Sequence, residues 1–155
     1  MQEVTNMDWS WTQIVTWLIV ISGWWLVNRQ NNIREKRKEI RALIDKVLFL
    51  IDEIEQQAIH YHTKAEMSDE IAFQLKRGLH QKLRDKLKIL NLREINTDSC
   101  SQPLKELRQA ITLKNFDTTS FAQQNLSSNI ITNIWFARDK LSQEVEKCFL
   151  KTYDK

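Results

Sequence analysis

The side chains best suited to metal chemistry are the three histidines. His60 and His62 flank Tyr61 in a stretch with helical spacing, where residues two apart point in different directions. These two histidines can share a metal only if the helix ends there, with Glu66 as a third ligand, and His80 stands alone. The spacing therefore predicts surface histidines near a helix end, and no metal or cofactor is expected.

The two cysteines, Cys100 and Cys148, are the only thiols in the chain. They form no CxxC pair and have no histidine close by in sequence, which argues against a metal or a disulfide framework. We expect two reduced thiols in a reducing compartment. Cys148 also falls on an apolar stripe, which indicates a small core residue.

Signatures of catalysis are missing from the sequence. It contains no Gly-rich phosphate loop, no HExxH, no GxSxG and no DxDxDG motif. With 2 glycines in the chain, a site lined by backbone amides is hard to build. We therefore expect no enzymatic activity and no catalytic residue.

A basic stretch over residues 76–93, in the predicted second helix, could bind nucleic-acid phosphates. It contains seven Lys and Arg side chains, namely Lys76, Arg77, Lys82, Arg84, Lys86, Lys88 and Arg93. No base-stacking aromatic accompanies them, so the favoured interpretation is charge pairing between helices. An antiparallel hairpin would bring Glu55 near Lys76 and Asp45 near Lys86.

Composition restricts the fold that positions these residues. Hydrophobic residues make up 42% of the 155 residues and charged residues 28%, which is typical of a folded protein. Only 2 glycines and 1 proline are present, whereas sheets and long loops need turn residues. An all-α fold is predicted. The net charge of +3 does not by itself indicate a nucleic-acid binder.

Residues 9–28 are predicted to form a transmembrane helix. These residues carry no charge, and about 20 helical residues cross a bilayer core. Tryptophans mark both ends and the middle of the segment, at Trp9, Trp11, Trp17, Trp24 and Trp25. The acidic start without Lys or Arg argues against a signal peptide.

Basic residues follow this segment and none precedes it, so the positive-inside rule predicts a short external N-terminus over residues 1–8. The remainder, residues 29–155, should form a cytoplasmic helical bundle at the inner membrane. The basic side chains are candidate contacts for anionic lipid headgroups, and they are Arg29, Arg34, Lys36, Arg37, Lys38 and Arg41.

One face of the segment carries the small residues Thr12, Thr16 and Gly23 at helical spacings. Small residues let two helices approach closely in lipid, although no GxxxG motif is present. This face is a candidate for packing between transmembrane helices, with ordinary lipid contact as the alternative.

Four helices are predicted after the transmembrane segment. The first, over about residues 31–62, has apolar residues at 3–4 spacing and resembles a coiled-coil or bundle seam. Ser68 should cap a second helix that ends near residue 92 or 95, and Pro103 should begin a short third. A capping box of Ser120 and Gln123 predicts the start of a fourth. Short connections imply an antiparallel three- to four-helix bundle.

Trp135 and Phe136 fall outside the apolar stripe of the fourth helix and are a candidate protein contact. We expect a membrane-anchored interaction protein that assembles with itself or with a partner protein. One alternative is an effector that perturbs the bilayer through oligomerised transmembrane helices. Another is a membrane-tethered nucleic-acid binder that uses the basic second helix.

Overall fold

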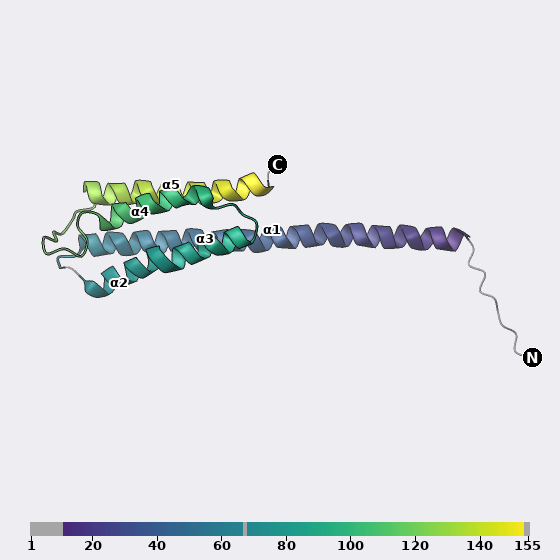
Figure 1. Cartoon of the computed structure of the whole chain (residues 1–155), viewed down its shortest axis with the longest axis horizontal. Coiled ribbons are helices and arrows are strands. Elements are labelled where there is room, and N and C mark those ends of the chain that lie inside the picture. Colours follow the sequence, from purple (N-terminus) through teal and green to yellow (C-terminus); the bar gives the residue numbers. More distant parts are fainter. Residues whose placement is uncertain (1–10, 67, 154–155) are drawn as a thin grey trace, which may run out of the picture. The chain divides into compact units, whose positions relative to one another are not determined.

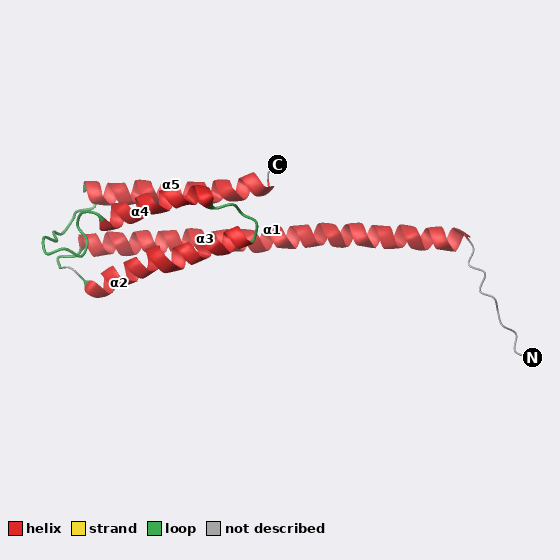
Figure 2. Ribbon diagram, in the orientation of Figure 1, coloured by secondary structure: helices red, strands yellow, loops and turns green. Residues whose placement is uncertain are grey.

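A computed structural model of the chain describes residues 11–66 and 68–153. Within these ranges the secondary structure is helical, with no strand (Figure 2). The chain divides into two compact units between Lys38 and Glu39. The longest helix, α1 (Trp11–Thr63), contributes residues to both units.

No helix within the described residues is both long enough and apolar enough to cross a bilayer. The transmembrane prediction for residues 9–28 is therefore wrong for the part that the structure describes. Residues 11–28 belong to α1, but polar side chains and tryptophans dilute the aliphatic ones. The polar side chains are Thr12, Gln13, Thr16, Ser22 and Asn28. The absence of charge alone overstated how apolar this segment is.

Residues 39–153 form a helical bundle whose rods run up and down alternately (Figure 1). The C-terminal part of α1 is followed by a bent rod of α2 (Asp69–Arg77), the π-helical turn η1 (Gly78–Lys82) and α3 (Leu83–Leu92). The 3₁₀ turn η2 (Asp98–Cys100) leads into α4 (Ser101–Thr112), and α5 (Asn129–Tyr153) completes the bundle. The predicted hairpin of the first two helices is present.

The apolar stripes meet in one core. Their buried members on α1 are Ile40, Ile44, Val47, Ile51, Ile54, Ala58 and Tyr61, and those on the next rod are Leu75, Leu79, Leu83, Leu87 and Leu90. The core also includes Leu107 and Ile111 of α4 and Leu141 and Val145 of α5. Gly78 lies against α1, because a Cβ at this position would be 3.2 Å from Ile54 Cγ1. The 3–4 spacing thus predicted the buried faces from Ile40 onward, whereas Ile33 and Leu126, which were predicted to lie on the same stripes, are exposed.

Helix ends follow local chemistry. The Ser68 side chain accepts a hydrogen bond from the Ile71 amide, as predicted. At the end of α3, Glu94 takes a positive φ of 71°, and the Ile95 amide donates to the Leu90 carbonyl at 3.1 Å. Together with the buried Ile95 side chain, these contacts form a Schellman cap. Pro103 lies in the first turn of α4, two residues after its start at Ser101.

The predicted start of the last helix was wrong. Residues 113–128 form a loop, and α5 begins at Asn129 after Ser128, whose Oγ accepts from the Ile131 amide at 3.4 Å. Gln123 does not close a capping box, because its side-chain amide donates to the Thr63 carbonyl at 2.8 Å. A tertiary contact to the end of α1 therefore competes with the local cap.

Candidate functional site

The first surface of interest is the N-terminal part of α1. No side chain from Trp11 to Glu39 is buried. Twelve large apolar side chains in residues 11–27 are exposed, and they are Trp11, Ile14, Val15, Trp17, Leu18, Ile19, Val20, Ile21, Trp24, Trp25, Leu26 and Val27. They point in all directions around the helix, because they include two consecutive runs, residues 17–21 and 24–27. Trp9 lies outside the described residues.

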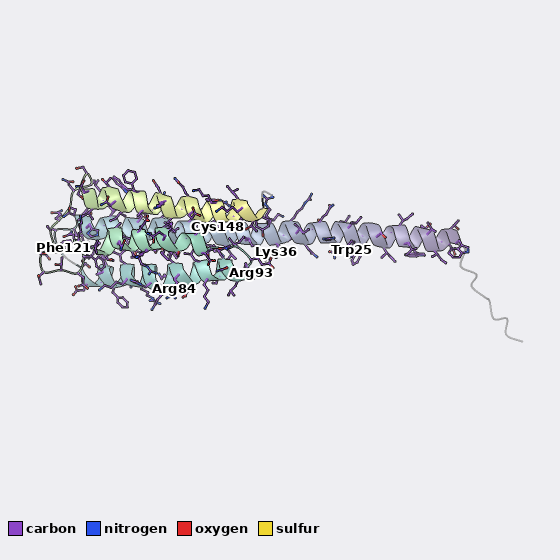
Figure 3. The ribbon with its side chains drawn as sticks, turned by 45° about the horizontal axis from the view of Figure 1, so that its top comes forward. Trp25, Lys36, Arg84, Arg93, Phe121 and Cys148 are labelled. Carbon is purple, nitrogen blue, oxygen red and sulfur yellow. The ribbon has the colours of Figure 1, made fainter. Side chains whose placement is uncertain are left out.

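The basic end of this surface combines an aromatic ring with cations. The Arg29 guanidinium lies over the Trp25 ring, 5.5 Å from its centroid. A shallow groove is lined by Trp25, Asn28, Arg29, Asn32, Ile33 and Lys36. Figure 3 labels Trp25 and Lys36 on this stretch of α1. An indole beside cationic groups suits the boundary between hydrocarbon and lipid phosphate.

The six predicted headgroup residues do not behave alike. Arg29, Arg34, Lys36, Arg37 and Lys38 are exposed, and Lys38 pairs with Glu35 at 3.0 Å. Arg41 instead belongs to the bundle, where its guanidinium contacts the Glu146 carboxylate of α5 at 2.7 and 2.9 Å. This pair raises the pKa of Arg41. Arg41 therefore fastens α1 to α5.

The predicted packing face of small residues is exposed within the chain. Thr16 Oγ1 donates to the Thr12 carbonyl of its own helix at 2.7 Å. A Cβ on Gly23 would have no neighbour within 4 Å. Contact between two such helices stays a prediction.

Trp135 and Phe136 are neighbours in α5 but face different helices. The Trp135 side chain is 39% exposed and lies near Glu55 of α1. Phe136, 71% exposed, lines a groove between α4 and α5. Consecutive helical residues differ by about 100°, so the pair does not form one aromatic patch.

The groove between α4 and α5 has an apolar floor and a charged rim. Ala110, Leu113, Ile130, Phe136 and Ala137 supply the apolar side chains. At the rim, Lys140 Nζ donates to a Glu106 carboxylate oxygen at 2.6 Å, which lowers the pKa of Glu106. Leu113 is as exposed as Phe136, so the groove presents two large apolar side chains to a partner.

Cross-helix charges pair differently from the prediction. Arg138 of α5 contacts Glu55 at 3.0 Å and also pairs with Asp52, while Asp45 pairs with Arg41 of its own helix at 3.0 Å. Lys76 contacts Asp117 in the 113–128 loop at 2.5 Å. The hairpin prediction omitted α5 and this loop, both of which compete for the same charges.

A buried polar network at the end of α1 was missed. His62 is fully buried rather than on the surface, and its Nε2 lies 3.0 Å from the Ile111 carbonyl. Nε2 must therefore donate, and Nδ1 accepts from the Asn115 amide at 3.4 Å. Burial lowers the pKa of His62. The sequence signal was available, because His62 lies four residues after the core residue Ala58.

Asn115 connects this network to the loop. Its side-chain oxygen accepts from the Ala122 amide at 2.9 Å, and its nitrogen donates to the Ala122 carbonyl at 2.9 Å. The Tyr61 hydroxyl accepts from the Asp117 amide at 3.0 Å, and the Tyr61 ring packs against Phe116 and Phe121. The loop is thereby held on the end of α1. Across the described ranges, no three His, Cys, Asp or Glu side chains gather in a way that could hold a metal ion.

Comparisons with protein-family models, with curated proteins and with solved structures found no match. The functional conclusions therefore depend on the surfaces described above.

Proposed function

We propose that this chain is a membrane-attached interaction protein. In this proposal the apolar N-terminal part of α1 binds a lipid bilayer, and the bundle offers the groove between α4 and α5 to a second copy or a partner protein. Because the positive-inside rule applies only to a helix that crosses the bilayer, no orientation is assigned to the attached chain.

The observation that supports attachment is the exposure of twelve large apolar side chains in residues 11–27. A helix that is apolar on all sides is normally surrounded by protein or lipid. Complete burial of one Val, Leu or Ile side chain is worth about 1.5–3 kcal/mol, so partial burial of several would support stable binding. Each Lys or Arg near an anionic bilayer adds about 1 kcal/mol.

Vesicle flotation of the 155-residue chain tests the attachment. We expect it to float with vesicles of a phosphatidylcholine and phosphatidylserine mixture, and a triple variant Trp17→Ser, Trp24→Ser, Trp25→Ser to lose at least about 10-fold in binding. Phe73→Ser is the matched control, since Phe73 is an exposed aromatic residue of α2. Equal flotation of both variants, or no flotation of the parent chain, would contradict the proposal.

The observation that supports a protein contact is the pair of exposed side chains Leu113 and Phe136 in one groove. Phe136→Ser should weaken assembly, measured by light scattering in mild detergent or by pull-down from native membranes, while leaving the helical circular dichroism unchanged. Phe73→Ser again serves as the control. An assembly that tolerates Phe136→Ser and responds to Phe73→Ser would assign the contact to another surface.

The nucleic-acid alternative has one supporting observation. Arg108 of α4 hydrogen-bonds the Leu79 carbonyl at 3.2 Å, and burial followed by the charge of Arg108 lowers the pKa of the neighbouring His80. Burial lowers the pKa of Arg108, and the charge of Arg84 lowers it further. Two guanidinium groups, those of Arg84 and Arg108, thus lie in one region beside His80. Steeply salt-dependent binding of a labelled oligonucleotide, lost in Arg84→Glu, would favour this function.

The effector alternative predicts that vesicles leak when the chain binds. Release of a trapped dye from the same vesicles, at a protein concentration that gives flotation, distinguishes perturbation of the bilayer from simple attachment. Its premise of oligomerised transmembrane helices has no support among the described helices.

A further inference from the structure

Two thiols that are far apart in sequence lie in contact in the bundle. Cys100 ends the 3₁₀ turn η2, and Cys148 lies in the C-terminal part of α5. Their Sγ atoms are 3.8 Å apart, close to van der Waals contact, and both cysteines are free thiols. Figure 3 labels Cys148 on α5. Nothing in the proposed membrane attachment or protein contact uses this pair.

The surroundings differ between the two sulfurs. Cys148, 4% exposed, lines a small cavity together with Asn96, Asp98, Ser99, Lys151 and Thr152. Cys100 does not line this cavity, and burial, followed by the charge of Cys148, raises its pKa strongly. A small oxidant in the cavity therefore reaches Cys148 before Cys100.

The Ser99 hydroxyl provides a polar neighbour for the reactive thiol. Its Oγ lies 3.4 Å from Cys148 Sγ. The Glu144 carboxyl lies close to the same hydroxyl, which lowers the pKa of Glu144. Either the Cys148 thiol or the Ser99 hydroxyl can donate in the contact between them.

We propose that Cys100 and Cys148 form a redox site, in which a peroxide oxidises Cys148 and Cys100 resolves the product into an intrachain disulfide. In the first step the Cys148 thiolate attacks one oxygen of hydrogen peroxide, the O–O bond breaks, and Cys148 sulfenic acid and hydroxide form. In the second step the Cys100 sulfur attacks the Cys148 sulfur, and water leaves with the Cys100 proton. Two thiols and one peroxide thus give one disulfide and two waters.

The geometry permits the second step with a local movement. A disulfide needs an S–S distance of about 2 Å, so the sulfurs must approach each other by about 1.8 Å. Cys100 belongs to a three-residue 3₁₀ turn, whose Cys100 amide donates to the Thr97 carbonyl at 3.0 Å. Such a turn is easier to move than the hydrogen-bonded helix α5 that holds Cys148. The disulfide would join the start of α4 to α5 and close a loop across a sequence separation of 48.

The test titrates the 155-residue chain with hydrogen peroxide, then denatures it, alkylates free thiols and measures the intact mass. We expect both thiols to disappear together in a monomer that is lighter by two hydrogen atoms and has a higher urea midpoint. Reduction should restore both thiols and the original midpoint. Survival of both thiols under conditions that oxidise the urea-unfolded chain would overturn the proposal, as would disulfides formed only between chains.

Two single variants separate the roles of the thiols. Cys100→Ser should leave a Cys148 sulfenic acid that dimedone traps, whereas Cys148→Ser should give no dimedone adduct on Cys100. The reverse pattern, or sulfinic acid on Cys148 of the parent chain without a disulfide, would contradict the assigned order. The peroxide titration of the unsubstituted chain shows whether the disulfide forms, so the proposal can be tested even if a variant fails to fold.

Discussion

The two parts of α1 share a backbone conformation and differ in what surrounds their side chains. From Trp11 to Glu39 no side chain is buried, whereas from Ile40 to His62 every third or fourth side chain enters the core. Both parts contain many Ile, Leu and Val residues. What distinguishes them is the arrangement of the apolar residues, which surround the helix from Trp11 to Val27 and gather mainly on one face from Ile40 to His62.

This difference shows how one helix can serve two environments. A stripe at 3–4 spacing leaves a polar face for water and needs other helices of the bundle on the apolar face only. A helix that is apolar on all sides leaves no face for water, so its stability in solution depends on lipid or on another protein. The bundle follows from the stripe on one face, and the proposed membrane attachment follows from the helix that is apolar on all sides.

The largest effect should come from shortening the same residue in each part of α1. Ile51→Ala removes a fully buried side chain and should lower the free energy of unfolding by about 2–5 kcal/mol. Ile21→Ala, at a position that is 57% exposed, should change it by less than about 0.5 kcal/mol. Urea titrations followed by circular dichroism in mild detergent measure both. Similar losses in both variants would mean that Ile21 is also packed against protein.

A smaller effect should come from removing the cation that pairs with one carboxylate in each part of α1. The Glu55 side chain is 18% exposed, and Arg138→Met removes the guanidinium that contacts its carboxylate at 3.0 Å. The free energy of unfolding should fall by about 1–2 kcal/mol at pH 7. Lys38→Met removes a pair whose side chains are both largely exposed and should have no measurable effect.

The same Arg138 variant has a pH signature. Burial raises the pKa of Glu55 in the folded chain, and Arg138 lowers it, so losing Arg138 raises this pKa further. When a carboxyl has a higher pKa in the folded than in the unfolded chain, the free energy of unfolding falls as the pH rises from the lower pKa to the higher one. The loss caused by Arg138→Met should therefore be smaller at about pH 4.5 than at pH 7. A loss that is independent of pH would show that packing of the Arg138 side chain dominates.

The smallest predicted effect concerns His62 and is seen in the pH dependence of unfolding. Because burial lowers the pKa of His62, the unfolded chain binds a proton near the ordinary value of about 6.5 and the folded chain does not. Stability should therefore be intact above that pH and decrease below it, until the folded pKa is reached. Urea midpoints between about pH 7 and about pH 5.5 should show this decrease, reduced in His62→Gln.

Two controls accompany the His62 measurement. His60→Gln alters an exposed histidine of the same helix and should leave the slope unchanged. His80→Gln should reduce it only slightly, because burial and Arg108 lower the pKa of an exposed ring. If His62→Gln keeps the full slope, another titrating group is responsible.

The sequence was most informative where one local rule operated. Ser68 capped a helix as predicted, and the apolar stripe from Ile40 to Tyr61 was buried as predicted. It was least informative where two partners competed for one side chain. Gln123 binds the end of α1 instead of capping a helix, and Glu55 binds Arg138 of α5 instead of Lys76. Contacts between distant segments decide such competitions, and spacing along the chain does not reveal them.

The candidate sites follow the same division. Spacing singled out the tryptophans and basic residues near the start of α1, and their contact with lipid stays a prediction. The separation of Trp135 from Phe136, the buried His62 and the contact of Cys100 with Cys148 were not predicted. Each of these depends on which helix packs against which face.

By itself, the sequence determined that the chain is helical, which faces of its helices are apolar and where its charges concentrate. These properties depend on residue type and on periods of three to four residues, which are local. Only the tertiary structure decided that the loop of residues 113–128 closes over the end of α1, that Arg41 and Arg138 bind α1 to α5, and that two thiols meet across the bundle. Residues 34 to 105 positions apart in sequence become neighbours only when the helices pack.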